Sequence, residues 1–373
     1  MKSTPLLLLT GYLGSGKTTL LNRMLRNSRG IKFAVIVNDI GEVNIDASLI
    51  EQGGIAGRKD ENLVALQNGC ICCTLKMDLV EQLNQIVSTG RFDYIVVEAS
   101  GICEPEPIAR TICSIPYLGE EYVKNGYARL DCIVTIVDAL RMRDEFSCAK
   151  DLLRGNIGKD DIENLVIEQV EFCNKILLNK ASEISAEELG RVRGIIRALQ
   201  PKAEIIECDY GDVDFDSILN TGEFNYDSVS ASAAWITEVE KGAEGGEGEV
   251  EEYGIGTFVY YNRRPFDINK FDHFVAKNWP AGVIRAKGMC YFADNPDECY
   301  VFEQAGAQTS LKSVGQWYAT MPEYELERQL ETDPALQRDW DPEYGDRMQK
   351  LVFIGQNMDR GSIRESLDKC LAD

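Results

Sequence analysis

Basic residues and histidine are scarce in this sequence. It has 39 Lys and Arg against 61 Asp and Glu, one histidine, and a formal net charge of −22. Nucleic acid and anionic membranes are therefore not expected as main partners, because binding to phosphate groups needs clustered Lys and Arg. The single histidine, His273, cannot form a histidine-rich metal site, and we expect it to be a surface or packed residue.

Long apolar runs are also absent. No stretch of about 18 apolar residues occurs, so no membrane-spanning helix is expected. The apolar run Leu6–Leu9 is too short for a secretory signal. We therefore expect a cytoplasmic protein, in which thiols stay reduced. Its twelve cysteines are then metal ligands, redox groups or small core residues rather than disulfides.

The length of 373 residues suits two domains. In residues 1–225, short apolar runs alternate with amphipathic stretches, which is typical of an α/β fold with a mostly parallel sheet covered by helices. Helical spacing of apolar residues marks 75–87, and Ser185 with Glu188 forms a capping box before a helix over 189–199. The expected strands are Leu6–Thr10, Phe33–Val37, Tyr94–Glu98, Cys132–Val137, Ile176–Asn179 and Ala203–Glu207.

Composition changes after residue 225. Segment 226–254 is expected to be a linker, because its part from Glu238 to Glu252 is acidic, rich in glycine and without apolar periodicity. Residues 255–373 are expected to form a smaller α+β domain. Its predicted strands are Thr257–Tyr261, Val283–Phe292, Glu298–Gln304 and Lys350–Ile354, and its predicted helices are Ile268–Val275 and Ile363–Leu371.

The strongest motif is a phosphate-binding loop, GYLGSGKT at 11–18, which lies between an expected strand and an amphipathic helix. The backbone N–H groups of such a loop and the helix N-terminus cradle the β-phosphate. Lys17 is expected to reach the β- and γ-phosphates, and the Thr18 hydroxyl to hold Mg²⁺. Nucleotide binding is also assigned to Gly14, Ser15, Gly16 and Thr19. The chain is therefore expected to hydrolyse a nucleoside triphosphate.

Hydrolysis also needs an acidic residue at the end of another strand, near the Mg²⁺ ion and the attacking water. Glu98 follows four apolar residues in DYIVVEASG at 93–101, and we expect it to orient the water or to hold Mg²⁺ through a water. Asp138, at the end of the apolar run 133–137, is a competing candidate. A turn or helix cap is an equally weighted role for Asp138.

Asn179 and Lys180 follow a further strand and are similar to the start of the Asn-Lys-x-Asp motif with which GTPases recognise the base. In that motif the Asp accepts hydrogen bonds from N1–H and the amino group of guanine. Here the fourth position is Ser182, whose hydroxyl is a weaker acceptor. GTP is the favoured nucleotide, but the choice between GTP and ATP stays open at this position.

Three thiols lie within four residues, at Cys70, Cys72 and Cys73, just before an expected helix. The dipole of a helix N-terminus lowers the pKa of nearby thiols. Three thiolates and a fourth ligand form a tetrahedral site for a divalent transition metal, and Glu42 is the candidate for the fourth. The alternative is that these cysteines are small core residues, as we expect for the other cysteines, most of which lie in apolar runs.

Together these motifs resemble those of the CobW-type (CobW/HypB/UreG-like) metallochaperone GTPases. The matching segments are GYLGSGKTT at 11–19, NDIGEVNID at 38–46, GCICC at 69–73, EASG at 98–101 and NKAS at 179–182, with RRPFD at 263–267 and RAKG at 285–288 similar to the C-terminal domain of that family. The resemblance implies slow GTP hydrolysis coupled to the delivery of a metal to a client metalloprotein.

The resemblance also implies the roles of individual residues. The three clustered cysteines bind the metal between the nucleotide and a switch segment around Asp39–Glu42, which triphosphate and Mg²⁺ bring into order. Asp39 joins Lys17 and Glu98 in the catalytic set. Thiolates suit Zn²⁺ or Co²⁺ as cargo. A nucleotide- or metal-dependent homodimer is compatible with these features.

Two other functions stay open at this point. One is a non-enzymatic metal sensor or buffer, which would bind GTP and metal without turnover. The other is a P-loop kinase that phosphorylates a small molecule with Glu98 as base. The cysteine cluster would have no role in such a kinase.

Overall fold

The computed structural model describes residues 2–37, 76–147, 160–233, 236, 252–306 and 308–372. The chain divides into two compact units. The first contains residues 1–145, 165–193 and 200–233, and the second contains residues 146–164, 194–199 and 234–373. Each unit has its own sheet and is described by itself.

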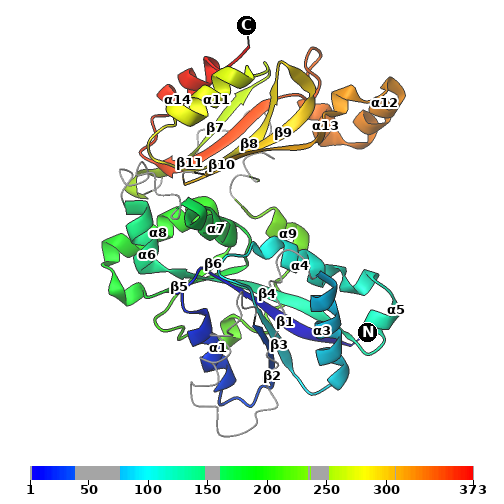
Figure 1. Ribbon diagram of the computed structural model, residues 1–373, viewed down its shortest axis with the longest axis vertical. Helices are drawn as coiled ribbons and strands as arrows, with labels where there is room; N and C mark the ends of the chain where they lie inside the picture. Colours follow the sequence, from blue (N-terminus) through cyan, green and yellow to red (C-terminus); the bar gives the residue numbers. More distant parts are fainter. Residues whose placement is uncertain are drawn as a thin grey trace. The chain divides into compact units, whose positions relative to one another are not determined.

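The first unit is built on a six-stranded sheet in the order β2-β3-β1-β4-β5-β6, and every neighbouring pair is parallel (Figure 1). The strands are β1 (Ser3–Thr10), β2 (Phe33–Val37), β3 (Tyr94–Glu98), β4 (Tyr127–Asp138), β5 (Lys175–Asn179) and β6 (Glu204–Glu207). Every residue of β2, β3 and β5 is buried, as expected for a parallel sheet covered on both faces. All six predicted strands and the predicted α/β class are therefore confirmed.

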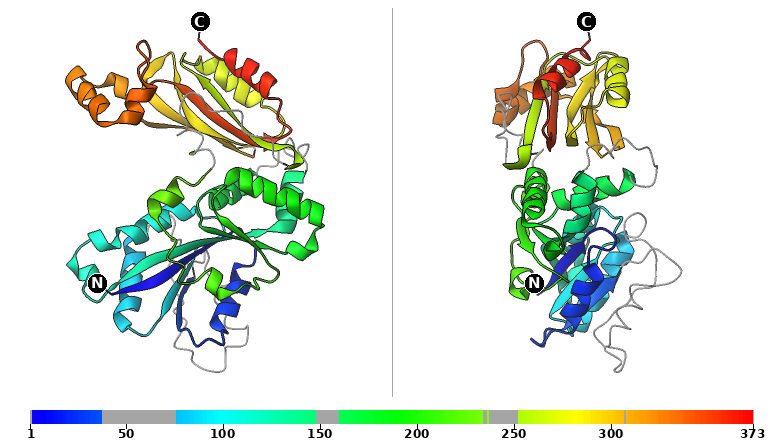
Figure 2. Two further views of the ribbon diagram at one scale, coloured as in Figure 1. Left: turned by 180° about the vertical axis from the view of Figure 1, so that it is seen from behind. Right: turned by 90° about the vertical axis from the view of Figure 1, so that its left-hand side faces the viewer.

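Helices cover both faces of this sheet (Figure 2). They are α1 (Lys17–Leu25), α3 (Lys76–Thr89), α4 (Pro105–Ser114), α5 (Glu120–Val123), α6 (Ala139–Ser147), α7 (Asp160–Glu171), α8 (Ala186–Leu199) and α9 (Tyr226–Ser230). The predicted capping box begins α8: the Ser185 N–H donates to Glu188 Oε2 at 2.8 Å, and the Glu188 N–H donates to Ser185 Oγ at 3.3 Å. Helix α9 lies at the start of the segment expected to be a linker.

A buried carboxylate holds the segment after β6 against the sheet. Asp131, in β4, is 0% exposed. It accepts hydrogen bonds from Tyr94 Oη at 2.6 Å and from the backbone N–H groups of Thr221 at 3.0 Å and Gly222 at 2.9 Å. Burial and this hydrogen bond raise the pKa of Tyr94. β4 starts at Tyr127 rather than at the predicted Cys132. A charged residue, Asp131, can lie inside this buried strand because hydrogen bonds satisfy its carboxylate.

The second unit is built on an antiparallel sheet in the order β10-β9-β8-β11-β7. Its strands are β7 (Ile255–Asn262), β8 (Val283–Phe292), β9 (Asn295–Ala305), β10 (Gln308–Gln316) and β11 (Gln349–Gln356), and its helices are α11 (Ile268–Lys277), α12 (Glu323–Thr332), α13 (Pro334–Asp339) and α14 (Arg360–Asp368). The core against α11 and α14 is aromatic. The ring centroid of Phe271 lies 4.9 Å from that of Phe266 and 5.2 Å from that of Phe302. The predicted α+β class is confirmed.

Strand β10 and helices α12 and α13 were not predicted. Most residues of β10 are exposed and polar, so the strand has no apolar alternation. Helix α12 buries no residue. Both elements therefore lack the periodic signal that burial imposes on a sequence. Within the described ranges, no helix has the length and apolar character needed to cross a bilayer.

We expect Asp131→Ala to lower the free energy of unfolding of the first unit by about 3 kcal/mol, because one buried and two partly buried donors lose their acceptor. Tyr94→Phe, which removes one of those donors, should cost about 1 kcal/mol. Urea unfolding followed by circular dichroism measures both changes. Equal losses in the two variants would show that Asp131 does not organise the segment after β6.

Candidate nucleotide-binding site

The phosphate-binding loop joins the end of β1 to the start of α1. Gly11 and Gly16 have φ values of 137° and 114°, which L side chains rarely adopt. A Cβ atom at Gly11 would lie 2.4 Å from the Ile136 carbonyl oxygen, and one at Gly16 would lie 2.4 Å from Asn179 Nδ2. Conformation and close packing therefore both require glycine at these two positions of the motif.

The loop encloses one buried positive charge, the ammonium of Lys17. The buried Lys17 ammonium donates hydrogen bonds to the carbonyl oxygens of Gly11 at 2.7 Å and Tyr12 at 3.3 Å. Gly16 caps α1 without a side-chain hydrogen bond to the first turn. The Ser15 hydroxyl is buried and has no hydrogen-bond partner among the described residues. Such a loop, with a helix N-terminus and an ammonium beside it, binds a phosphate group.

The predicted catalytic Glu98 lies at the same edge of the sheet. It is the last residue of β3, is 2% exposed, and pairs in register with Leu9 of β1. The following segment touches the phosphate-binding loop, because a Cβ atom at Gly101 would lie 2.8 Å from the Leu13 backbone nitrogen. The structure therefore brings the EASG segment and the GYLGSGKT segment together.

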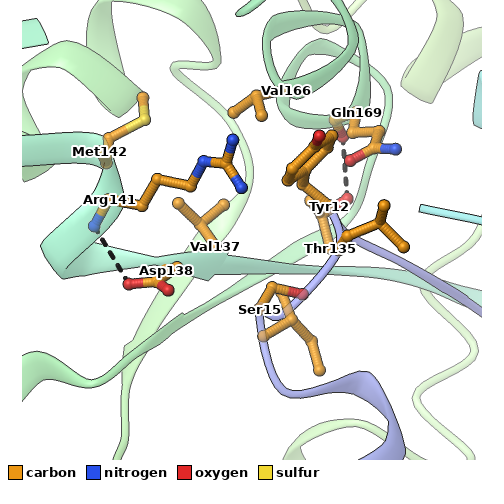
Figure 3. A pocket seen from close by; sticks show the side chains of 11 residues that line it. Tyr12, Ser15, Thr135, Val137, Asp138, Arg141, Met142, Val166 and Gln169 are labelled. Carbon is orange, nitrogen blue, oxygen red and sulfur yellow. Dashed lines mark hydrogen bonds between the residues drawn. The ribbon is translucent and has the colours of Figure 1, made fainter. Parts of the chain in front are cut away.

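Gln169, in α7, holds the segment after Glu98. Its side-chain amide donates to the carbonyl oxygens of Gly101 and Cys103, each at 3.2 Å. The backbone carbonyl oxygen of Gln169 accepts a hydrogen bond from Thr135 Oγ1 at 2.8 Å. Figure 3 shows Gln169 beside Tyr12, whose ring lies 4.0 Å from the guanidinium carbon of Arg141. The sequence did not reveal Gln169 or Arg141, because each is a single polar residue within a helix and belongs to no motif.

Asp138 caps a helix, which is one of the two roles expected for it. Its Oδ1 accepts from the Arg141 backbone N–H at 3.1 Å, which caps the start of α6 (Figure 3). Its Oδ2 forms an ion pair with Lys180 Nζ. Lys180 was assigned to nucleotide binding, and this ion pair fixes its ammonium at the end of β4. Glu98 is therefore the better candidate for the hydrolytic carboxylate.

Asn179 joins two parts of the site. Its amide nitrogen donates to the Ser15 carbonyl oxygen at 2.7 Å, and its Oδ1 accepts from the Gly211 N–H at 3.1 Å. One side chain thus links the phosphate-binding loop to the loop that follows β6. These two bonds position the loops relative to each other, and the predicted contact of Asn179 with the nucleotide stays a prediction.

The predicted metal site and part of the predicted catalytic set fall outside the described residues. These residues are Asp39, Glu42, Cys70, Cys72 and Cys73. In the parts of the chain that the structure describes, no three or more His, Cys, Asp or Glu side chains form a group that could hold a metal ion. His273 lies on α11 and is exposed.

The other described cysteines are core residues, as predicted. All are buried except the partly buried Cys113. Burial raises the pKa of Cys208 and Cys370 to about 11 and that of Cys299 to about 12. Thiols buried in this way act as small core residues.

Two family models match the chain. Residues 5–207 match the CobW/HypB/UreG nucleotide-binding domain, and residues 255–371 match the cobalamin synthesis protein cobW C-terminal domain. The chain is 36% identical to the zinc-regulated GTPase metalloprotein activator 1 of Dictyostelium discoideum, over 98% of this chain and 79% of that protein. It is 30% identical to the zinc chaperone YjiA of Escherichia coli, over 96% of this chain and 95% of that protein.

We expect Asn179→Ala to weaken triphosphate binding by roughly 10- to 100-fold, because the Ser15 carbonyl and the Gly211 N–H both lose a buried partner. Calorimetric titration with GTP measures the change once circular dichroism has shown that the variant is folded. Asn125→Ala is the control, since that exposed amide contacts only Ser88 among the hydrogen bonds of the described residues. Equal affinities in the two variants would contradict the positioning role of Asn179.

Proposed function

The chain belongs to the CobW/HypB/UreG family, and from that premise we propose that it is a GTPase that binds a divalent transition metal, Zn²⁺ or Co²⁺, and delivers it to a client metalloprotein. The family predicted from the motifs is confirmed. The observation that carries the proposal is the geometry of the phosphate-binding loop, in which the Lys17 ammonium is bound to the carbonyl oxygens of Gly11 and Tyr12 and α1 begins directly after Gly16. A metal sensor without turnover and a small-molecule kinase have no such support from the relatives.

The residues around the loop divide the work of hydrolysis. Lys17 and the N–H groups of the loop hold the β- and γ-phosphates and stabilise the charge that develops on them. Glu98 orients the attacking water from the end of β3. Gln169 keeps the segment after Glu98 against the loop through its bonds to Gly101 and Cys103. Asp39 belongs to the proposed catalytic set on the strength of the family motif.

The donor set at this edge fits Mg²⁺, which prefers hydroxyl and carboxylate oxygens. Thr18 is in the first turn of α1 and Glu98 ends β3, so an oxygen donor lies on each of the two segments that contact at Leu13 and Gly101. Thr18 would hold the ion, with Glu98 acting through a water. When bound, Mg²⁺ would neutralise part of the negative charge on the β- and γ-phosphates.

The metal is the cargo, and we propose that Cys70, Cys72 and Cys73, with Glu42, bind it. Thiolates favour Zn²⁺ and other soft or borderline ions over Mg²⁺. Relatives whose names state a zinc function support zinc as the first choice. The protein would act in the cytoplasm, where these thiols stay reduced. A client metalloprotein and a nucleotide- or metal-dependent homodimer complete the proposal.

We expect Lys17→Ala to lower the rate of GTP hydrolysis at least roughly 100-fold, because the main cation of the phosphate site is removed. Zinc affinity in the absence of nucleotide should stay unchanged. Phosphate release and zinc titration measure the two properties. Lys312→Ala is the control, since that side chain is 68% exposed on β10. Hydrolysis at the parental rate in Lys17→Ala would contradict the proposed enzyme.

The double variant Cys72→Ser with Cys73→Ser should weaken Zn²⁺ and Co²⁺ binding at least roughly 100-fold, because two thiolate ligands are lost. Competition with a chromophoric chelator, with and without Mg²⁺ and GTP, measures the affinities. The parent should show a nucleotide-dependent change in metal affinity. Cys113→Ser is the matched control outside the cluster. Parental metal affinity in the double variant would exclude the cluster as the cargo site.

A further inference from the structure

The loop that follows β6 is bound closely to the base-recognition segment 179–182. The Cys208 N–H donates to the Leu178 carbonyl at 3.0 Å, and the Ala181 N–H donates to the Cys208 carbonyl at 3.3 Å. The Gly211 N–H donates to Asn179 Oδ1 at 3.1 Å. Asp209 lies between Cys208 and Gly211. The backbone bonds of these two residues therefore set its position.

The same loop is also bound to the helix that begins the phosphate site. Arg23 of α1 donates from Nε to the Tyr210 carbonyl at 2.8 Å and from Nη1 to Asp212 Oδ1 at 2.8 Å. A Cβ atom at Gly211 would lie 3.3 Å from the Leu20 backbone. Asp209 therefore lies on a loop that connects the base-recognition segment with the phosphate-binding helix.

The carboxylate of Asp209 lies in space beside residue 182, the motif position at which the base-reading acid is missing. Its Oδ1 accepts the backbone N–H of Ser182 at 3.1 Å. Ser182 is the residue that replaces the Asp of the Asn-Lys-x-Asp motif. A carboxylate is thus present beside residue 182, although it comes from a different strand end.

The neighbouring carboxylates are neutralised by cations, whereas Asp209 is not. Asp212 pairs with Arg23, and Asp138 pairs with Lys180. Among the described residues, no Lys or Arg forms an ion pair with Asp209, and its only side-chain hydrogen bond is to a neutral N–H. A partly exposed carboxylate with an oxygen left over is suited to accept hydrogen bonds from a neutral ligand.

We propose that Asp209 reads the guanine base, accepting hydrogen bonds from N1–H and the 2-amino group in place of the acid that Ser182 replaces. This inference rests on the proposed use of GTP and deepens it. It makes Asp209 a specificity-determining residue and restores the guanine selectivity that the sequence motif alone lacks. Strong discrimination then follows, because adenine offers no such pair of donors and would leave the carboxylate unsatisfied.

The experiment compares the binding of GTP, ITP, XTP and ATP, each with Mg²⁺, to the full chain. ITP lacks the 2-amino group, and XTP carries an oxygen in its place. The parent should bind GTP at least roughly tenfold more tightly than ITP and ATP. Asp209→Asn keeps the Oδ1 acceptor for Ser182 but presents an N–H₂ donor. It should weaken GTP binding by roughly 10- to 100-fold and strengthen XTP binding, because the amide donates to the 2-oxo group.

Two further variants make the result specific. Asp212→Asn, on the same loop, should leave the GTP:XTP ratio at the parental value. The exchange variant with Ser182→Asp and Asp209→Ser should regain the preference for GTP, because the acid returns to the motif position.

The outcomes separate the two proposals. If the parent prefers GTP but Asp209→Asn keeps the parental GTP:XTP ratio, Asp209 is only a cap for the Ser182 N–H, and this inference is overturned while the GTPase proposal stands. If the parent itself binds ATP as tightly as GTP, the proposed nucleotide is wrong, and the role of Asp209 is overturned with it.

Discussion

The nucleotide site depends on one buried amide. Asn179 donates to the carbonyl of Ser15 and accepts the N–H of Gly211, so its side chain links the phosphate-binding loop directly to the loop after β6. Gly16 has no room for a side chain because Asn179 Nδ2 occupies that space. Gly16 and Asn179 therefore depend on each other, because a side chain at position 16 would displace the Asn179 amide.

The parallel sheet explains why polar residues that are distant in the sequence lie at the same edge as Asn179. The carboxyl ends of parallel strands lie at one edge, and ligands of open α/β sheets bind there. In register, Leu9 of β1 pairs with Glu98 of β3, and Asp138 of β4 pairs with Asn179 of β5. The last residues of these three strands, Glu98, Asp138 and Asn179, thus each contribute a polar side chain at one edge, and the residues directly before them are apolar and buried.

Sequence patterns predicted the elements that burial shapes. All six strands of the first sheet were predicted, because each is an apolar run, and Ser185 with Glu188 marked the start of α8. β10 could not be predicted because its side chains are mostly solvent-exposed. At the site, motif spacing identified Lys17, Glu98 and Asn179 but not Gln169 or Asp209. Those two residues act through contacts between segments 68 and 27 positions apart, which no local pattern records.

The bonds of Lys17 to the carbonyls of its own loop have a thermodynamic consequence. The carbonyl oxygens of Gly11 and Tyr12 accept hydrogen bonds from the ammonium, so the loop itself fixes the position of its cation. A phosphate that binds this ammonium replaces one set of oxygen acceptors with another. Preorganisation of this kind leaves more of the interaction energy as affinity.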